Sequence, residues 1–156
     1  MSYSDLILKL GHQRWFARVG RAMVPVDRAV QKATGGRWSV IGKGVVPEML
    51  LTTTGRKSGQ PRSVPLLYAR DGDAYVVVAS NWGQEHHPAW SGNLMAEPKA
   101  VVTVDGRAVD VVAELTDAEE KARVWPLVTA VWPAYDTYAE RAGRDIRVFL
   151  LHPSPR

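Results

Sequence analysis

The sequence predicts a mainly β domain with flanking helices, an α+β fold in which about six strands, mostly antiparallel, close into a small barrel. Two hairpin signals support this prediction: Asp71-Gly72 and Asp105-Gly106 each separate two runs of apolar and β-branched residues. The size of the chain agrees, because 156 residues of which 46% are hydrophobic suffice to bury one core. We therefore expect a globular domain and not a fibrous or disordered chain.

The first 44 residues differ from the rest in charge. They contain eight Lys or Arg and two Asp, a net charge of +6, whereas residues 45–156 carry a net charge of −2. Apolar residues recur at roughly helical spacing over residues 4–24, and a second short helix is expected over residues 27–34. We expect residues 1–44 to form a basic, amphipathic helical arm and residues 45–156 to form the barrel. Such an arm lies on an anionic membrane or packs on its own domain, and the sequence leaves both open.

The strands and helices of the barrel domain follow from local patterns. Apolar and β-branched runs predict strands over Met49–Thr54, Arg62–Ala69, Ala74–Ser80, Val101–Val104, Ala108–Ala113 and Ile146–Leu151. Helices are expected over His87–Ala96, from a capping box at Thr116–Glu119 to about Ala130, and from Pro133 to about Ala142. Since the helices are inserted late in the chain, we expect them to flank the barrel.

Composition argues against several kinds of site. The chain has no cysteine, so disulfides, thiolate nucleophiles and Cys-ligated metals are impossible, and a reducing cytoplasm fits. No apolar run approaches the roughly 18–20 residues that span a bilayer, and residues 1–30 lack an unbroken signal-peptide core. The adjacent His86 and His87 have no third ligand at a recognisable spacing, so we expect no metal. The pI of about 9.6 would suit a nucleic-acid binder, but the basic arm lacks a recognition motif.

The segment Thr52–Arg62 concentrates polar chemistry. Two glycines let its backbone approach a ligand closely, and Arg56, Lys57 and Arg62 can donate to an anion. The segment lacks the glycine and lysine order of a Walker loop. It is either an anion-binding turn or an exposed, charged hairpin turn.

Two further segments combine polar and aromatic residues. Ala79–Gly83 ends an apolar strand in a polar and aromatic stretch, and strand ends beside loops are common places for ligand contacts. Trp132, Tyr135 and Tyr138 lie three residues apart and can share one helix face. They form either core packing or an aromatic wall for a flat, apolar substrate.

Seven motifs occur in order over about residues 45–153. They are Leu51–Arg62, Val78–Ser80, Pro88-x-Trp90-x-x-Asn93-Leu94, Pro98, Trp125-Pro126, Trp132-Pro133-x-Tyr135-x-x-Tyr138 and Val148-Phe149. This ordered set resembles the family of deazaflavin-dependent nitroreductases. The resemblance implies a six-stranded split β-barrel of the flavin-reductase and pyridoxamine-phosphate-oxidase type. It also implies coenzyme F-420, an 8-hydroxy-5-deazaflavin with a phospholactyl oligoglutamate tail, in an oxidoreductase that passes hydride to quinones, activated alkenes or nitroaromatics.

The same resemblance implies a role for individual residues. The cofactor would contact Thr54, Gly55, Arg56, Lys57, Ser58, Gly59, Arg62, Val64, Pro65, Ala79, Ser80, Asn81, Trp90 and Asn93. The acceptor would contact Leu67, Trp132, Tyr135 and Tyr138, and the proton would come from Ser80, from Tyr135 or Tyr138, or from water. The three basic residues of the turn would hold the phosphate, and the basic arm would meet the glutamates. Hydride delivery itself requires no acid–base dyad, since the cofactor performs the difficult step.

The chain departs from the best-known nitroimidazole-activating member of that family at three positions. Leu67 and Trp132 stand where that protein has Tyr, and Asn81 stands where it has Lys. We therefore expect retained cofactor binding and a changed choice of acceptor. We also expect a cytoplasmic monomer or homodimer that binds no nucleic acid, and that is peripheral to the inner face of the membrane in the case where the basic arm lies on anionic lipid instead of packing on the barrel. The alternatives are a non-catalytic carrier of the deazaflavin or of a lipid-like ligand, and an FMN-dependent oxidoreductase on the same barrel.

Overall fold

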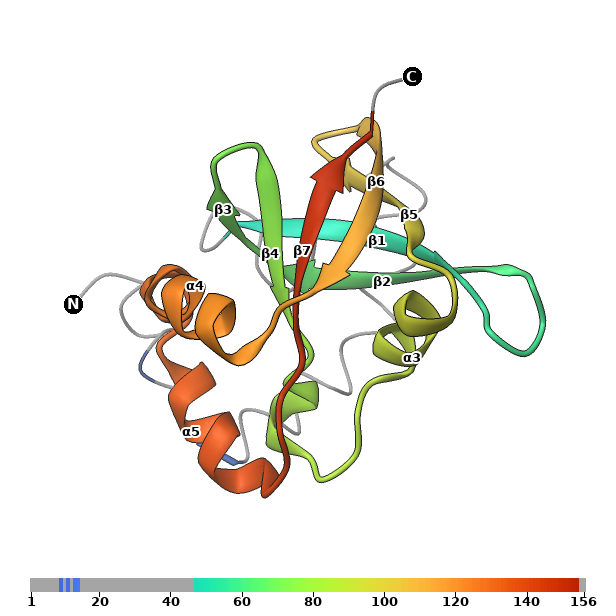
Figure 1. Ribbon diagram of the computed structural model, residues 1–156. Helices are drawn as coiled ribbons and strands as arrows, with labels where there is room; N and C mark the ends of the chain where they lie inside the picture. Colours follow the sequence, from blue (N-terminus) through green and yellow to red (C-terminus); the bar gives the residue numbers. More distant parts are fainter. Residues whose placement is uncertain (1–8, 10, 12, 15–46, 155–156) are drawn as a thin grey trace.

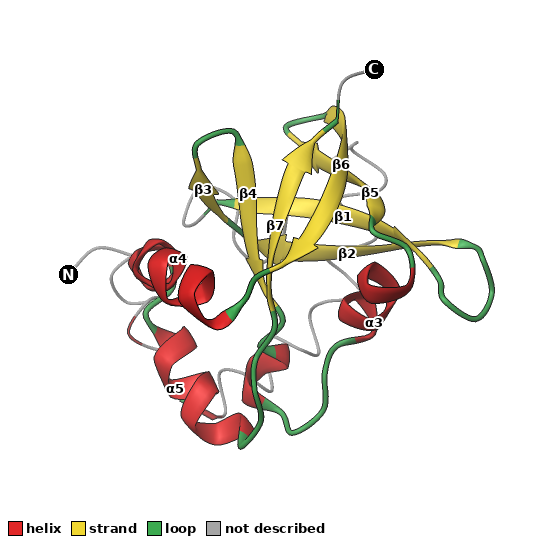
Figure 2. Cartoon of the chain, viewed as in Figure 1, coloured by secondary structure: helices red, strands yellow, loops and turns green. Residues whose placement is uncertain are grey.

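The structure is a computed structural model that describes residues 9, 11, 13, 14 and 47–154. Both helices expected in the arm therefore lie outside the described residues, apart from four isolated positions. Within residues 47–154 the chain forms one curled antiparallel sheet with helices on its outside (Figures 1 and 2). The predicted α+β split barrel is confirmed.

The sheet contains seven strands within the described residues, one more than expected. They are β1 (Glu48–Thr54), β2 (Pro61–Leu67), β3 (Ala69–Asp71), β4 (Ala74–Val78), β5 (Lys99–Val104), β6 (Arg107–Leu115) and β7 (Val148–Pro153). Their order is β2-β1-β5-β6-β7-β4-β3. The strand expected over Arg62–Ala69 is broken at Tyr68, because β2 pairs with β1 at one edge of the sheet and β3 pairs with β4 at the other.

This break at Tyr68 explains why the sheet closes. The two edge strands are consecutive in the chain, so the sheet must curl until its edges meet. In Figure 1, β1 and β2 accordingly cross behind β4 and β7. The interior holds an apolar cluster that includes the fully buried Met49, Leu51, Val77 and Val102. Burial of such side chains contributes about 1.5–3 kcal/mol each.

The predicted hairpins are confirmed. Asp105 and Gly106 have φ values of 50° and 79° and connect the paired residues Val104 and Arg107. Two positive φ values in a two-residue loop are typical of the turn whose twist matches that of its strands. Gly72, with φ of 58°, lies in the corresponding turn between β3 and β4.

The helices are α3 (Ala89–Ala96), α4 (Ala118–Val131) and α5 (Ala134–Ala142), together with the short 3-10 helix η1 (Asn81–Gly83). α4 and α5 cover the outer face of the sheet and build a second apolar cluster with residues of β4 and β7. The predicted cap of α4 was wrong by one residue. Asp117 Oδ1 accepts from the Glu120 N–H at 2.8 Å, because the Thr116 hydroxyl already donates to the Val148 carbonyl at 2.9 Å.

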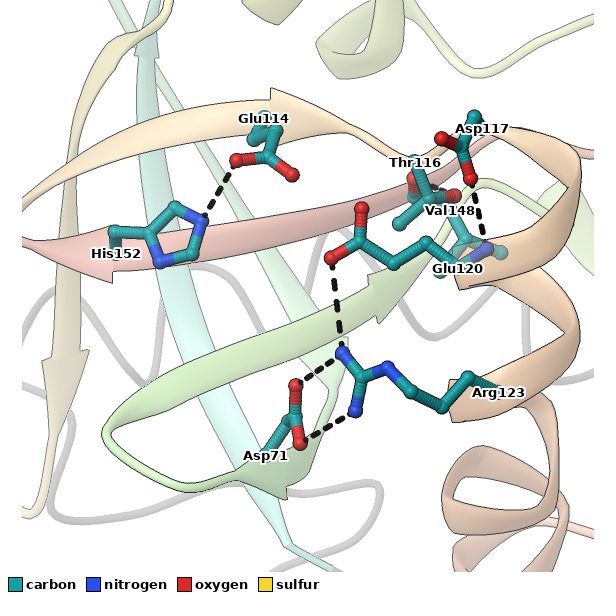
Figure 3. A network of polar contacts seen from close by, with 8 residues as sticks. All are labelled: Asp71, Glu114, Thr116, Asp117, Glu120, Arg123, Val148 and His152. Atoms are coloured by element: carbon teal, nitrogen blue, oxygen red, sulfur yellow. Dashed lines mark hydrogen bonds and ion pairs between the residues drawn. The ribbon is translucent and has the colours of Figure 1, made fainter.

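A polar network fixes α4 to the rim of the sheet (Figure 3). Arg123 donates to both carboxylate oxygens of Asp71, at 3.1 and 2.8 Å, and pairs with Glu120 at 3.6 Å. His152 and Glu114 form a second pair at 3.2 Å. Since the Arg123 side chain is 54% exposed, water screens these ion pairs and they contribute little to stability.

Candidate active site

The turn between β1 and β2 projects beyond the barrel and passes close to α3 (Figure 1). The Gly55 N–H donates to the Gln60 carbonyl and the Gly59 N–H to the Gly55 carbonyl, both at 2.8 Å. A Cβ at Gly55 would lie 2.6 Å from Ser58 Oγ, and Gly59 has a φ of 69°. Both glycines are therefore required by the compact shape of the turn. We call residues 55–60 the anion turn.

One arginine of the anion turn binds α3. Arg56 donates from its backbone N–H and from Nη1 to Asn93 Oδ1, at 3.1 and 3.2 Å, and Nη1 also donates to the Ala89 carbonyl at 3.1 Å. Asn93 Nδ2 in turn donates to Thr53 Oγ1 at 3.1 Å. The side chains of Asn93 and Thr53 are buried. Arg56 and Asn93, both expected in the cofactor site, thus fix the turn against the helix.

The other two basic side chains remain available. Among the described residues Lys57 has no hydrogen bond or ion pair, and Arg62 contacts only Ser58 Oγ, at 3.5 Å. Both side chains are exposed, and the anion turn contains no acidic residue to neutralise them. With the Ser58 hydroxyl they form a donor set that suits phosphate or carboxylate groups.

The loop between β4 and α3 carries the next predicted residues. Ser80 is buried, and its hydroxyl has no hydrogen-bond partner within the described part of the chain, so it can bind a ligand. Asn81 has a φ of 47°, donates from Nδ2 to the His86 carbonyl at 3.0 Å and accepts at Oδ1 from Gln84 at 3.2 Å. The side-chain amide of Asn81 therefore binds two other residues of the same loop, and these bonds stabilise the conformation of the loop. The predicted strand end at Ser80 lies two residues beyond the last residue of β4.

Arg144, which the sequence patterns did not single out, holds the same loop. Its Nη2 donates to the carbonyls of Ala79 and Ser80 at 3.0 and 3.2 Å, and Nε donates to the Gln84 carbonyl at 3.1 Å. Nη1 lies 3.1 Å from His87 Nδ1. No motif surrounds this arginine, and an isolated Arg between a helix and a strand resembles an ordinary solvated side chain.

The aromatic residues of the late helices are buried together. The Trp132, Tyr135 and Tyr138 side chains are each at most 6% exposed, and the two tyrosine rings pack edge to face with centroids 6.3 Å apart. Burial raises the pKa of both tyrosines, so their hydroxyl groups stay protonated. We call these three residues the aromatic cluster, and Leu67 at the end of β2 packs against the larger apolar cluster to which they belong.

The two tyrosine hydroxyls differ in their partners. Tyr138 Oη donates to the Gly11 carbonyl at 2.9 Å and accepts from Trp132 Nε1 at 3.3 Å. The Tyr135 hydroxyl has no hydrogen-bond partner within the described part of the chain. Of the two phenols expected to serve the acceptor, Tyr135 is therefore the better placed, because the Tyr138 hydroxyl already has a donor and an acceptor.

β2 connects the two halves of the candidate site. It begins after the anion turn and ends at Leu67, and seven residues of strand span about 20 Å. Val64 and Pro65 lie halfway along this edge strand and are partly buried. The loop after β4 reaches the same end, because a Cβ at Gly83 would lie 3.2 Å from Tyr138 Cα.

One predicted site residue belongs to the interior. Trp90 is 7% exposed and packs against Phe149 in the barrel core with ring centroids 5.9 Å apart. Its effect on a ligand can only be indirect, through the position of α3. Elsewhere, the described residues contain no group of three or more His, Asp or Glu arranged to hold a metal ion.

Comparisons with known proteins agree on one family. The family model described as F420H(2)-dependent quinone reductase matches residues 19–153. An F420H(2)-dependent quinone reductase of Mycobacterium tuberculosis (strain ATCC 25618 / H37Rv) is 37% identical over 142 residues, which cover 88% of this chain and 95% of that protein.

Solved structures support the same relationship. The structure of an F420-H2 dependent reductase (FDR-A) is 36% identical with a TM-score of 0.63, covering 68% of this chain and 94% of that one. A domain-swapped dimer is 32% identical with a TM-score of 0.66, covering 82% and 94%. A heme binding protein from Mycobacterium smegmatis, 18% identical with a TM-score of 0.57 over 78% of this chain and 51% of that one, shares the fold alone.

Proposed function

The chain belongs to the F420H(2)-dependent quinone reductase family, and we propose that it binds coenzyme F-420 along β2 and reduces a quinone beside the aromatic cluster. The expected relationship to F-420-dependent split-barrel reductases is confirmed, and the protein is an F-420-dependent oxidoreductase. The family match begins at residue 19 and thus includes much of the basic arm.

One observation carries the proposed arrangement: one end of β2 has cations that form no ion pair with any described residue, and the other end has apolar and aromatic groups. Lys57 and Arg62, with the Ser58 hydroxyl, offer donors for the phosphate and glutamates of the cofactor tail. Leu67, which is partly buried, and the apolar cluster that contains Trp132, Tyr135 and Tyr138 lie at the other end, where a ring system would bind. A ligand with an anionic tail and a flat aromatic head matches this order of groups along a strand of about 20 Å.

The residues of the site bind and orient, and the reduced deazaflavin supplies the hydride when it is bound. Ser80 offers a hydroxyl near the end of β4, and Tyr135 offers a phenol that burial keeps neutral. A neutral phenol can donate to the quinone oxygen that gains negative charge on reduction, and such a contact strengthens in the transition state. Trp132 and Leu67 exclude water from the acceptor.

A cofactor and acceptor panel tests this proposal. Purified protein is titrated with F-420, FMN and FAD by fluorescence, and reduced F-420 is then oxidised anaerobically with menadione, an enone or a nitroarene. We expect F-420 to bind most tightly and menadione to react fastest, with the nitroarene slower. Tighter FMN binding would favour a flavin oxidoreductase, and F-420 binding without turnover of any acceptor would favour a carrier.

We further propose that the basic arm brings the enzyme to anionic membranes, where apolar quinones partition. The +6 charge of residues 1–44 and their interleaved apolar residues support this. Within the described residues, no helix has the length and hydropathy needed to cross a bilayer. Cosedimentation with anionic but not with neutral vesicles is expected. Binding to both alike, or to neither, would contradict an electrostatic membrane contact.

A further inference from the structure

The loop of residues 79–87 carries Ser80 and determines where its hydroxyl lies. The Gly83 N–H donates to the Ser80 carbonyl at 2.9 Å and the Gln84 N–H to the Asn81 carbonyl at 3.1 Å. Together with the bond from Asn81 Nδ2 to the His86 carbonyl, these contacts connect the loop to itself. They define the shape of the loop but do not fix its position on the barrel.

Arg144 supplies contacts from outside the loop, and they reach both of its ends. Its guanidinium donates to the carbonyls of Ala79 and Ser80 at the start and to the Gln84 carbonyl further along. Its remaining contact is with His87 Nδ1 near the loop end. Only a planar fork with several fixed donors can reach four acceptors spread in this way, and a lysine ammonium cannot.

The position of Arg144 is itself set by the elements that carry the aromatic cluster. It follows Gly143, which ends α5 with a φ of 61°, and precedes Ile146, which is 3% exposed in the cluster under α4 and α5. The same helix carries Tyr135. Arg144 thus links the loop that bears Ser80 to the helix that bears the candidate acceptor contact.

We propose that Arg144 is a positioning residue of the F-420 site, which holds Ser80 at a fixed place relative to Tyr135. This inference rests on the proposed function. A displacement of about 1 Å in such a site can lower a rate by up to about 10²-fold, whereas general loosening of the fold would not act selectively on turnover.

The test compares R144K and R144Q with a matched control, R123Q. Arg123 is also an arginine with several side-chain contacts, but it joins α4 to β3 through Asp71 and pairs with Glu120 of its own helix (Figure 3), and none of these partners belongs to residues 79–87. For each variant we would measure Tm, the Kd of F-420, kcat and KM with menadione, and hydrogen exchange of the peptide 79–87 in cofactor-free protein. R144K retains the charge, so it serves as the decisive variant should R144Q not fold.

We expect faster exchange across residues 79–87 in both Arg144 variants and unchanged exchange there in R123Q. For R144K, kcat should fall roughly 10- to 100-fold while the KM for menadione changes less than about threefold. R123Q should keep kcat within about twofold at a comparable Tm. Wild-type kcat in folded R144K, or an equal loss of kcat in R123Q, would overturn the positioning role. If wild-type protein fails to bind F-420, that result alone contradicts the proposed function. Unchanged hydrogen exchange of residues 79–87 in R144K would separately show that Arg144 does not hold the loop.

Discussion

The cations at one end of β2 and the Tyr138 hydroxyl at the other end differ in burial and in their protein partners. Lys57 of the anion turn and Arg62 at the start of β2 are exposed, and among the described residues only Ser58 contacts either of them. At the aromatic cluster, the Tyr138 hydroxyl is buried and both donates and accepts a hydrogen bond. Leaving a solvated cation unpaired costs little, whereas leaving a buried hydroxyl unpaired costs about 1–3 kcal/mol. Substitutions of the exposed cations should therefore change ligand binding without changing the stability of the fold. Substitutions in the aromatic cluster should change both.

The largest expected effect comes from the buried support beneath the turn. Asn93→Ala removes the acceptor of two Arg56 donors and leaves the buried Thr53 hydroxyl without its partner. We expect a loss of about 1–3 kcal/mol, or roughly 3–10 °C in Tm, together with weaker F-420 binding. Thermal unfolding measures the first and fluorescence titration the second. A Tm within 1 °C of wild type would show that the network does not support the turn.

The exposed cations of the turn should give the complementary result. Lys57→Ala and Arg62→Ala each remove a charge-assisted contact worth about 1.5–3 kcal/mol to a bound phosphate or carboxylate. The Kd of F-420 should therefore rise roughly tenfold or more, most strongly at low salt, while Tm stays at the wild-type value. Fluorescence titration at two salt concentrations measures the effect. An unchanged Kd in both variants would remove these side chains from the site.

The contrast between Arg56 and Lys57 shows how far the sequence alone can be interpreted. Both are basic residues in a glycine-bounded turn, and local pattern predicts the turn and its charge correctly. Which of them binds the protein depends on Asn93, which lies 37 residues beyond Arg56 in the chain. Hairpins and late helices, which follow from local signals, were predicted to within a few residues, whereas the break at Tyr68 follows from closure of the whole sheet.

The aromatic cluster illustrates the same limit. The spacing of Tyr135 and Tyr138 predicts a shared helix face, and both rings do lie together. The carbonyl that accepts from Tyr138 belongs to Gly11, 127 residues away, and no periodicity indicates that contact. Arg144 was missed for a related reason, since its four acceptors are backbone carbonyls and one histidine that no motif connects to it.

A smaller effect should distinguish the two tyrosines. Tyr135→Phe removes a hydroxyl with no protein partner among the described residues, so Tm should stay near wild type while kcat with menadione falls about tenfold, somewhat less than the loss of an oxyanion-hole donor. Tyr138→Phe removes the bonds to Gly11 and Trp132 and should lower stability by about 1 kcal/mol with little change in kcat. Steady-state kinetics and thermal unfolding measure both variants. The reverse pattern would make Tyr138 the acceptor contact.

The smallest expected effect is a pH dependence at the end of the loop that Arg144 holds. Because an arginine can only donate, His87 Nδ1 must accept, so the ring is neutral in the folded protein. Burial lowers the pKa of His87 from 6.5, and the charges of Arg147 and Arg144 lower it further, while Asp145 opposes them. The unfolded chain therefore binds this proton more readily than the folded protein does. The stabilising contribution is complete above pH 6.5 and is lost as the pH falls from there toward the lower folded pKa.

His87→Gln tests this dependence, because a glutamine can accept from Arg144 through Oε1 and does not titrate. Between about pH 6.5 and pH 5 the wild-type protein should lose more stability in urea unfolding than the variant does. His86→Gln is the matched control: His86 is exposed and meets the loop only through its carbonyl, which the substitution retains, so this variant should lose stability as the wild type does. Parallel pH profiles for wild type and His87→Gln would mean that the bond between Arg144 and His87 does not stabilise the loop, and Arg144 would then hold it through the three carbonyls alone.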